Sequence, residues 1–326
     1  MSFTRSKDLA SSRPGNESIK YSARPDTHFS RALGVGHDGR KLVLGLLFIA
    51  PALLTLAATF LYPVGYNLWL SLHSYNLVQL YLGFRFVGID NYLATLKDPY
   101  FWNGLRNSIT VTIGCLFLEL SIGMALALLL NRRVRGHSFF RFVCILPLLL
   151  IPAVTAYMWR FMFQYDGIIN YILHSVYLSP INWSTTIAGL VSVIITVVWQ
   201  NTPFSIIIFL AGLQSIDPEI WAAAKIDGAG PFARFTQVTL PLMRPFILVV
   251  LVIRTMDLLR LFDEGYILTG GAPARETETL SQLAYTNTFT FFEIGRGSAI
   301  TILEGIIVVT AVLFIFVAAA PRRSDK

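Results

Sequence analysis

"AAAKIDGAGPFARFTQVTLPLMRP", residues 222–245, is a polar, turn-rich stretch in a chain that is otherwise strongly apolar. It carries Lys225, Asp227, Arg234 and Arg244 together with glycines and prolines, and apolar runs flank it on both sides. Of the 326 residues, 54% are hydrophobic and only 14% are charged, whereas soluble domains have about 25% charged residues. The composition therefore indicates an integral membrane protein in which this stretch is a loop between two spans.

Six apolar runs are long enough to cross a hydrocarbon core about 30 Å thick, which takes roughly 20 residues of helix. We predict an all-α integral membrane fold with spans at about 42–72, 106–130, 139–163, 186–213, 245–267 and 299–320. The transmembrane domain would cover 42–320. Residues 1–41 and 321–326 would be tails, and the polar, serine-rich N-terminal tail is predicted to be disordered.

The distribution of basic residues predicts the orientation of these spans. If the N-terminus lies inside, the inner segments hold eighteen Lys and Arg residues and the outer segments hold six. Cytoplasmic loops carry such an excess, so both termini are expected in the cytoplasm. The net charge of +7 is then a matter of topology and gives no indication of nucleic-acid binding.

Residues 214–244 would accordingly form a cytoplasmic loop. Asp217 can cap a helix that begins at Pro218, and Glu219 complements the helix dipole there. Gly228 and Gly230 can end this helix, and Pro231 can begin a second one. The loop is predicted to be two short helices joined by a glycine turn.

The spacing within this loop resembles the cytoplasmic pattern of permease subunits of bacterial ABC importers: E-A-A, three residues, G, nine residues, I-x-L-P. Ala222, Ala223 and Ala224 stand at E-A-A, Gly228 follows, and Leu240 and Pro241 close the pattern. The chain departs at Ala222, where the pattern has glutamate, and conservatively at Val238. "DGAGPF" in the loop, "FLYPVGYNLWLSL" near Tyr62 and "YILTGGAP" from Tyr266 resemble the carbohydrate branch, the MalF-like, binding-protein-dependent sugar transport family.

This resemblance implies a type I importer permease fold and a role in ATP-driven carbohydrate import across the bacterial cytoplasmic (inner) membrane. It implies a second homologous permease subunit, two copies of a cytoplasmic ATPase subunit and an extracytoplasmic sugar-binding protein that docks on outer segments at about 73–105, 164–185 and 268–298. The chain lacks a P-loop, so no cofactor is expected on it and ATP-Mg would be used by the ATPase subunits. The residues implied to couple the loop to the ATPase are Ala222, Ala223, Ala224, Asp227, Gly228, Gly230, Leu240 and Pro241.

The fifth predicted span is costly to insert, because Arg254, Asp257 and Arg260 lie within it and each charge near the bilayer centre costs about 2.5 to 3.5 kcal/mol. Spacings of three and four residues predict a ladder of pairs from Arg254 to Glu264. This face either lines a wet translocation path or locks the subunit to its partner permease, and the sequence leaves both interpretations open. The resemblance implies sugar contacts on the spans that flank the loop; the candidates are Gln200, Asn201, Phe204, Arg254, Asp257, Leu258 and Leu261.

Two further acids, Glu119 and Glu304, lie in apolar runs, and a packing or inter-subunit role is expected for both. Other functions stay open: an ABC permease for a polyol or glycerol phosphate, or a secondary solute carrier. A membrane enzyme would need a paired acid and base or a metal site. The five histidines show no metal-ligand spacing, and the sequence offers no nucleophile with its base, so no catalytic residue is predicted.

Overall fold

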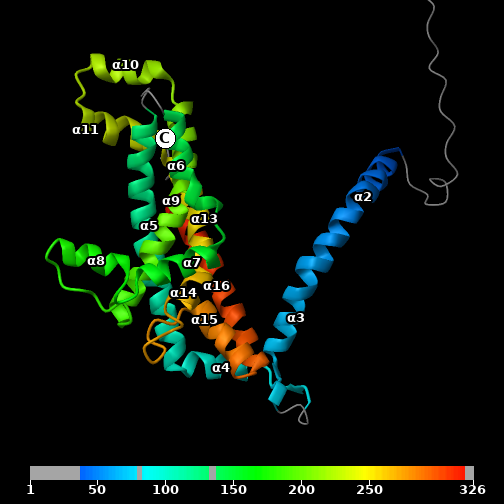
Figure 1. Ribbon diagram of the computed structural model, residues 1–326. Coiled ribbons are helices and arrows are strands. Elements are labelled where there is room, and N and C mark those ends of the chain that lie inside the picture. Colours follow the sequence, from blue (N-terminus) through cyan, green and yellow to red (C-terminus); the bar gives the residue numbers. More distant parts are fainter. Residues whose placement is uncertain (1–36, 79–82, 132–136, 320–326) are drawn as a thin grey trace, which may run out of the picture. The chain divides into compact units, whose positions relative to one another are not determined.

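The computed structural model describes residues 37–78, 83–131 and 137–319, and it is almost entirely helical (Figure 1). The chain divides into two compact units, Met1–Tyr62 and Pro63–Lys326. In the first unit, α2 (His37–Leu56) continues through a π-helical turn, η1 (Ala57–Leu61). This helix begins five residues before the predicted span and so takes in the end of the predicted tail. The rest of that tail, 1–36, lies outside the described residues.

The second unit is a bundle of helices with one small hairpin, in which β1 (His73–Ser74) pairs antiparallel with β2 (Arg85–Phe86). Its helices are α3 (Tyr62–Ser71, starting at the unit boundary), α4 (Asp90–Lys97), α5 (Pro99–Leu130), α6 (His137–Ile145), η3 (Leu146–Leu149), α7 (Pro152–Met162), α8 (Ile168–Ser175), α9 (Thr186–Ser215), α10 (Pro218–Ile226), α11 (Pro231–Ala233), η4 (Arg234–Thr239), α12 (Leu240–Leu242), α13 (Arg244–Leu259), α14 (Asp263–Leu268), α15 (Leu280–Tyr285), η5 (Thr286–Thr290) and α16 (Ile294–Ala319).

The core of the bundle lies where α5 packs along α9, with α13 against both. One apolar cluster joins Val111 and Cys115 of α5 to Val197 of α9 and Leu258 of α13. Small residues let the two long helices approach closely: a Cβ added to Gly123 would lie only 2.6 Å from the Cβ of Ser205. Such close contacts suit a membrane bundle, because lipid tails are as apolar as the side chains and packing must hold the helices together.

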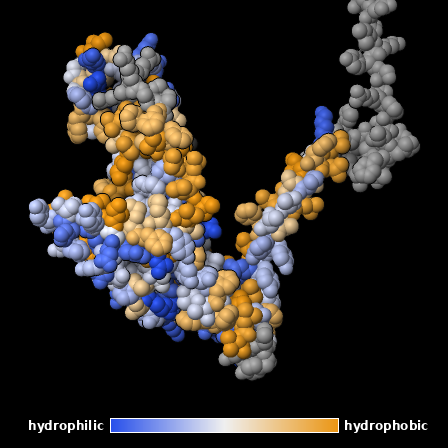
Figure 2. Space-filling model, viewed as in Figure 1, coloured by the Kyte–Doolittle hydropathy of each residue, from blue (hydrophilic) through white to orange (hydrophobic). Residues whose placement is uncertain are grey.

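Within the described residues, four helices are long and apolar enough to cross a membrane, or up to six spans are possible if each of two bent helix pairs counts as one. The four are Leu44–Ser71, Pro99–Leu130, Thr186–Ser215 and Ile294–Ala319. Figure 2 shows hydrophobic residues over the bundle below α10 and α11, and hydrophilic residues around α8. All six predicted runs are mainly helical, but two of them are not single helices.

The third predicted span, at 139–163, is not one straight helix but two helical segments. Phe139–Leu149 and Pro152–Met162 meet at 97°. The cause is local: Leu150 and Ile151, which precede Pro152, have extended backbones. A residue before proline is pushed out of the helical region, and proline itself supplies no N–H to continue the helix.

The fifth predicted span, at 245–267, is also interrupted. Its helix, α13, ends at Leu259, and α14 starts afresh at Asp263. Asp263 and Glu264 fall in the first turn of α14, where negative charge is favourable. Before α13, the segment Pro231–Leu242 meets Arg244–Leu259 at 65°.

Candidate functional site

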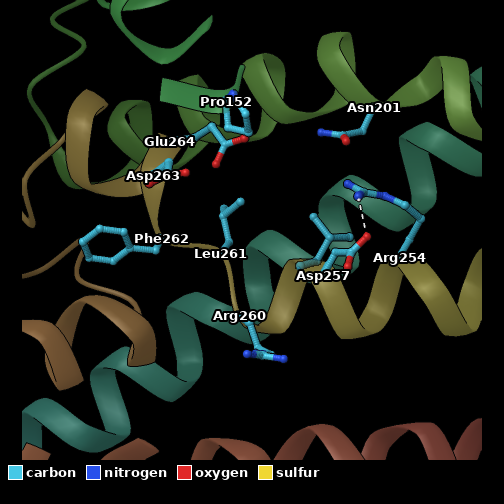
Figure 3. Close-up of a pocket in the computed structure, with 10 residues that line it drawn as sticks. Pro152, Asn201, Arg254, Asp257, Arg260, Leu261, Phe262, Asp263 and Glu264 are labelled. Carbon is cyan, nitrogen blue, oxygen red and sulfur yellow. Dashed lines mark hydrogen bonds and ion pairs between the residues drawn. The ribbon is translucent and has the colours of Figure 1, made fainter. Parts of the chain in front are cut away.

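A cavity of about 280 Å³ lies beside the C-terminal end of α13 (Figure 3). The break after Leu259 makes it, because the chain turns there and brings Leu261–Glu264 back toward α7 and α9. Five of the seven predicted substrate residues line it, together with Arg260, Phe262, Asp263, Glu264 and Pro152; those five are Asn201, Arg254, Asp257, Leu258 and Leu261. The predicted residues on α9 and α13 thus largely converge on one polar cavity.

Arg254 is held by a buried carboxylate on a different helix. Its Nε donates to Oε2 of Glu119 at 2.7 Å and its Nη2 donates to Oε1 at 2.9 Å. The two side chains are 6% and 0% exposed, so this is a two-pronged ion pair shielded from solvent. The third nitrogen, Nη1, donates to Oδ2 of Asp257 at 3.2 Å. Asp257 is 57% exposed, so its carboxylate is free to meet a ligand.

The predicted ladder of pairs along the fifth span holds only for its first step, Arg254 with Asp257. The pairs Asp257–Arg260 and Arg260–Glu264 are absent from the described part of the chain. The reason is that Arg260 stands past the helix end, with φ −106° and ψ 20°. Figure 3 shows its side chain pointing away from Arg254 and Asp257, while Asp263 and Glu264 lie near Pro152.

Gln200 and Phe204 do not line this cavity, in contrast to the prediction. The Nε2 of Gln200 donates to the carbonyl of Leu150 at 2.9 Å, so it satisfies a backbone group at the break in the third run. Phe204 packs against the apolar cluster of α5, α9 and α13. Next to Gln200, Trp199 packs edge-on against Trp159, with 5.7 Å between ring centroids.

The sequence did not reveal that Glu119 is the partner of Arg254, although it marked both as charges inside apolar runs. The two residues are 135 positions apart, beyond the reach of any helical spacing rule. One signal was present: an intramembrane charge is expected to pair with another. Pro152, Phe262 and Asp263 were missed altogether, because they reach the cavity only through the two helix breaks.

The predicted coupling residues all lie in the polar elbow formed by 217–242. The Asp217 carboxylate accepts from the backbone N–H of Glu219 at 2.9 Å and so caps α10, as predicted. Gly228 has φ +77°, a left-handed conformation that glycine adopts most easily. Pro231 then begins α11, also as predicted. Figure 1 shows α10 and α11 projecting from one end of the second unit, while α4 and α15 lie toward its other end.

No residue of α10 or α11 is buried, and the elbow exposes large apolar side chains at its tip. Ile226 is 85% exposed and Phe232 is 80% exposed. The three alanines at 222–224 leave this helix slender. A capped, slender helix with exposed apolar side chains beside a tight turn fits insertion into a groove on another protein.

The segment after α14 is fixed to the start of α5 by polar contacts. Nδ2 of Asn107 donates to the carbonyls of Glu276 at 2.6 Å and Glu278 at 2.9 Å. Arg275 pairs with Glu278 at 2.8 Å and lies over the ring of Tyr100. Burial raises the pKa of the Glu278 carboxyl even though Arg275 stabilises its charge. The end of the bundle opposite the elbow is therefore tied together by specific contacts rather than left as loose loops.

The bundle, the polar cavity inside it and the projecting elbow define a transport permease of the membrane. The chain belongs to the family described as binding-protein-dependent transport system inner membrane component, whose model matches residues 119–326. That match begins at the buried Glu119 and includes the whole elbow.

Proteins of known role are similar to almost the whole chain. The trehalose/maltose transport system permease protein MalF of Thermococcus litoralis is 37% identical over 273 residues, which cover 83% of this chain and 92% of that protein. The trehalose transport system permease protein SugA of Mycobacterium tuberculosis is 36% identical over 281 residues, covering 85% and 90%. The sulfoquinovosyl glycerol transport system permease protein SmoG of Agrobacterium fabrum is 34% identical over 263 residues, covering 80% and 85%.

Solved structures share the fold. A bacterial ABC transporter involved in the import of the acidic polysaccharide alginate has a chain that matches with a TM-score of 0.75 at 21% identity, covering 91% of this chain and 100% of that one. The same kind of transporter, in complex with its alginate-bound periplasmic protein, matches with a TM-score of 0.74 at 22% identity, covering 89% and 97%. The chain thus shares its fold with a chain of these ABC transporters.

Proposed function

We propose that this chain is a permease subunit of an ATP-driven, binding-protein-dependent importer of neutral carbohydrates in the bacterial cytoplasmic membrane. The bent third run and the run at 245–267 would each count as one span, which makes six, and both termini would face the cytoplasm. The observation that carries the proposal is the polar cavity at the end of α13. It occurs in a chain that belongs to a family of binding-protein-dependent transport components.

The cavity offers the mixture of groups that a sugar needs. Asp257 can accept hydroxyl hydrogens, and the Asn201 side chain can take part in further hydrogen bonds. Leu258 and Leu261 supply apolar surface for the C–H face of a ring. A mostly preformed site with a few polar groups among apolar ones is typical of small-molecule sites.

The charges around the cavity favour a neutral substrate over an anionic one. Arg254 and Arg260 bring positive charge, and Asp257, Asp263, Glu264 and the paired Glu119 bring negative charge. Because Glu119 already occupies two arms of Arg254, that guanidinium is not available as an anion clamp. A phosphate or sulfonate would therefore meet an excess of carboxylates, which disfavours glycerol phosphate and acidic sugars.

The elbow supports dependence on a separate ATPase. We infer that α10 and the turn at Gly228 sit in a cleft of the ATPase subunit, of which the importer has two copies, and that movement of the ATPase is passed through Leu240 and Pro241 into α13. A second permease subunit would complete the translocation path, and the extracytoplasmic binding protein would dock at the end of the bundle that holds α4 and α15. ATP-Mg would be bound by the ATPase chains alone.

The test is uptake by proteoliposomes that contain the assembled complex with its binding protein. Radiolabelled trehalose, maltose, sorbitol, glycerol 3-phosphate and a uronate would be offered with and without ATP inside the vesicles. We expect ATP-dependent uptake of a neutral sugar and none of the anions. Preference for an anion would overturn the substrate class, and uptake in vesicles that lack the ATPase chain would favour the secondary carrier instead.

A further inference from the structure

A second cavity, of about 260 Å³, lies among Phe262, which directly precedes α14, and the helices α15, η5 and α16. It shares one wall residue with the first cavity, Phe262, so the two are neighbours on either side of one aromatic ring. Neither the predicted substrate residues nor the coupling residues contribute to it. The side chains that matter for its chemistry are Phe262, Ser281, Tyr285, Thr288, Phe289 and Glu304.

One wall of this cavity is a row of aromatic rings. Phe262 and Tyr285 have ring centroids 5.0 Å apart, and Tyr285 and Phe289 are also 5.0 Å apart. Phe289 is 61% exposed, so much of its ring is open to a ligand. It is carried by η5, a π-helical turn of the kind often found at functional sites. Neighbouring rings are tilted by 47° and 36° to one another, and together they give an apolar surface of more than one ring's width.

The facing wall carries a carboxylate. Glu304 is only 7% exposed. It lies on α16, which has the highest hydropathy of the four long apolar helices in the described part of the chain. Its Oε1 accepts from Ser281 Oγ at 2.5 Å, and the charge of Arg260 stabilises the carboxylate electrostatically. Thr288 adds a hydroxyl to the same wall. A carboxylate in a membrane helix is costly and is retained where it pairs or serves a function.

We propose that this second cavity is a sugar-ring subsite adjoining the first, so that the path through this chain holds two linked neutral sugar rings at once. The inference rests on the proposed function. The C–H face of one ring would lie on Tyr285 and Phe289, with its hydroxyls donating to Glu304 and exchanging hydrogen bonds with Ser281 and Thr288. The next ring would lie beyond Phe262, against Asp257 and Asn201. An acyl chain of lipid would also fit aromatic rings, but it has no groups to hydrogen-bond with Glu304, Ser281 or Thr288, which line the same cavity.

The test is photolabelling of the assembled complex with its binding protein in nanodiscs, with trehalose that carries a photoreactive diazirine. The labelled segments would be found by mass spectrometry, with excess trehalose as competitor. We expect competed label in both 254–264 and 280–290. Phe289→Ala should lower label in the second segment about five-fold, the loss of one aromatic contact, and leave label at 254–264 unchanged. Glu304→Gln should act in the same direction.

Phe314→Ala is the matched control, since Phe314 is 71% exposed and lies away from both cavities, and it should change neither label. Yield and monodispersity of each variant complex would show that it has folded. Competed label confined to 254–264 would overturn the second subsite and leave sugar import standing. Label at 280–290 that trehalose does not compete would also overturn it, as expected of a lipid-facing groove. Competed label at neither segment would overturn both this inference and the carbohydrate import on which it rests.

Discussion

Arg254 carries a full charge into the interior of the bundle, and Glu119 is what makes this tolerable. The pair is fully desolvated and two-pronged. A buried ion pair adds little net stability compared with apolar residues, but removing one partner leaves an uncompensated charge. The pair therefore fixes the position of Arg254, and through it the orientation of Asp257 at the cavity.

Glu119→Gln should destabilise the complex by about 3 kcal/mol or more, because the guanidinium of Arg254 loses its charged partner in a buried site. The measurement is the thermal unfolding midpoint of the purified complex. The double variant Glu119→Gln with Arg254→Gln should recover most of the loss. A single variant as stable as the wild type would show that the pair is not buried in the assembled transporter.

Asp257→Asn should change transport without changing stability, the opposite of what is expected for Glu119→Gln. Asp257 is 57% exposed, so its pair with Arg254 should contribute less than about 1 kcal/mol. Stability should hold while the KM for sugar uptake rises several-fold, because the acceptor for sugar hydroxyls is weakened. An unchanged KM would remove Asp257 from the substrate path.

Gly228→Ala tests the turn of the elbow. A residue with a Cβ adopts the φ of +77° of Gly228 at a cost of about 1 kcal/mol. An added Cβ would meet no atom within 4 Å, so the backbone conformation is the only source of this cost. We expect normal amounts of complex in the membrane and uptake reduced several-fold. Gly305→Ala is the control: an added Cβ there also meets open space, but Gly305 lies in the helix α16 without a positive φ and outside the elbow, so this variant should transport like the wild type.

At the level of single residues, the sequence predicted much of the elbow and only part of the cavity. The cap at Asp217 and the helix start at Pro231 depend on neighbours in the chain, so local rules suffice for them. The bond from Arg254 to Glu119 and that from Gln200 to Leu150 join different helices, and no local rule could provide them.

The elements show why helix ends matter more than helix lengths here. α13 stops at Leu259 although its sequence continues as a helical pattern, and the cavity lies in the space that this stop creates. Hydropathy predicted where apolar segments lie. It could not predict that two of them would bend, because a run interrupted by proline or by a few charges keeps its mean hydropathy while the backbone turns.

Packing between α5 and α9 can be tested at their closest contact. Gly123→Leu would force its side chain into Ser205 and the backbone beside it, and overpacking of this kind costs typically 1 to 3 kcal/mol. We expect a lower yield of assembled complex by size-exclusion chromatography. Gly305→Leu, on α16 with nothing within 4 Å of its added Cβ, is the control and should assemble normally.

In the second unit, the elbow, the charged cavity and the polar segment after α14 follow one another along the bundle. The elbow projects at one end, the charged cavity lies within, and the tied segment from Arg275 to Glu278 lies with α4 and α15 toward the other end (Figure 1). This arrangement fits a permease that receives substrate at one end and is moved by a motor at the other. Composition and the loop pattern predicted that class of protein from the sequence. The two cavities required the structure.

The central claim is that the elbow is held by a separate ATPase subunit, and cysteine cross-linking measures this directly. Ala223→Cys would be introduced in a chain whose own two cysteines, Cys115 and Cys144, are replaced by alanine. The assembled complex would then be treated with a short bifunctional reagent in the presence and absence of ATP. The account predicts a cross-link from position 223 to the ATPase chain, with a yield that changes with nucleotide, and no such product from a cysteine placed at Ser175 in α8. A complex that transports normally but gives no cross-link between α10 and the ATPase would contradict it.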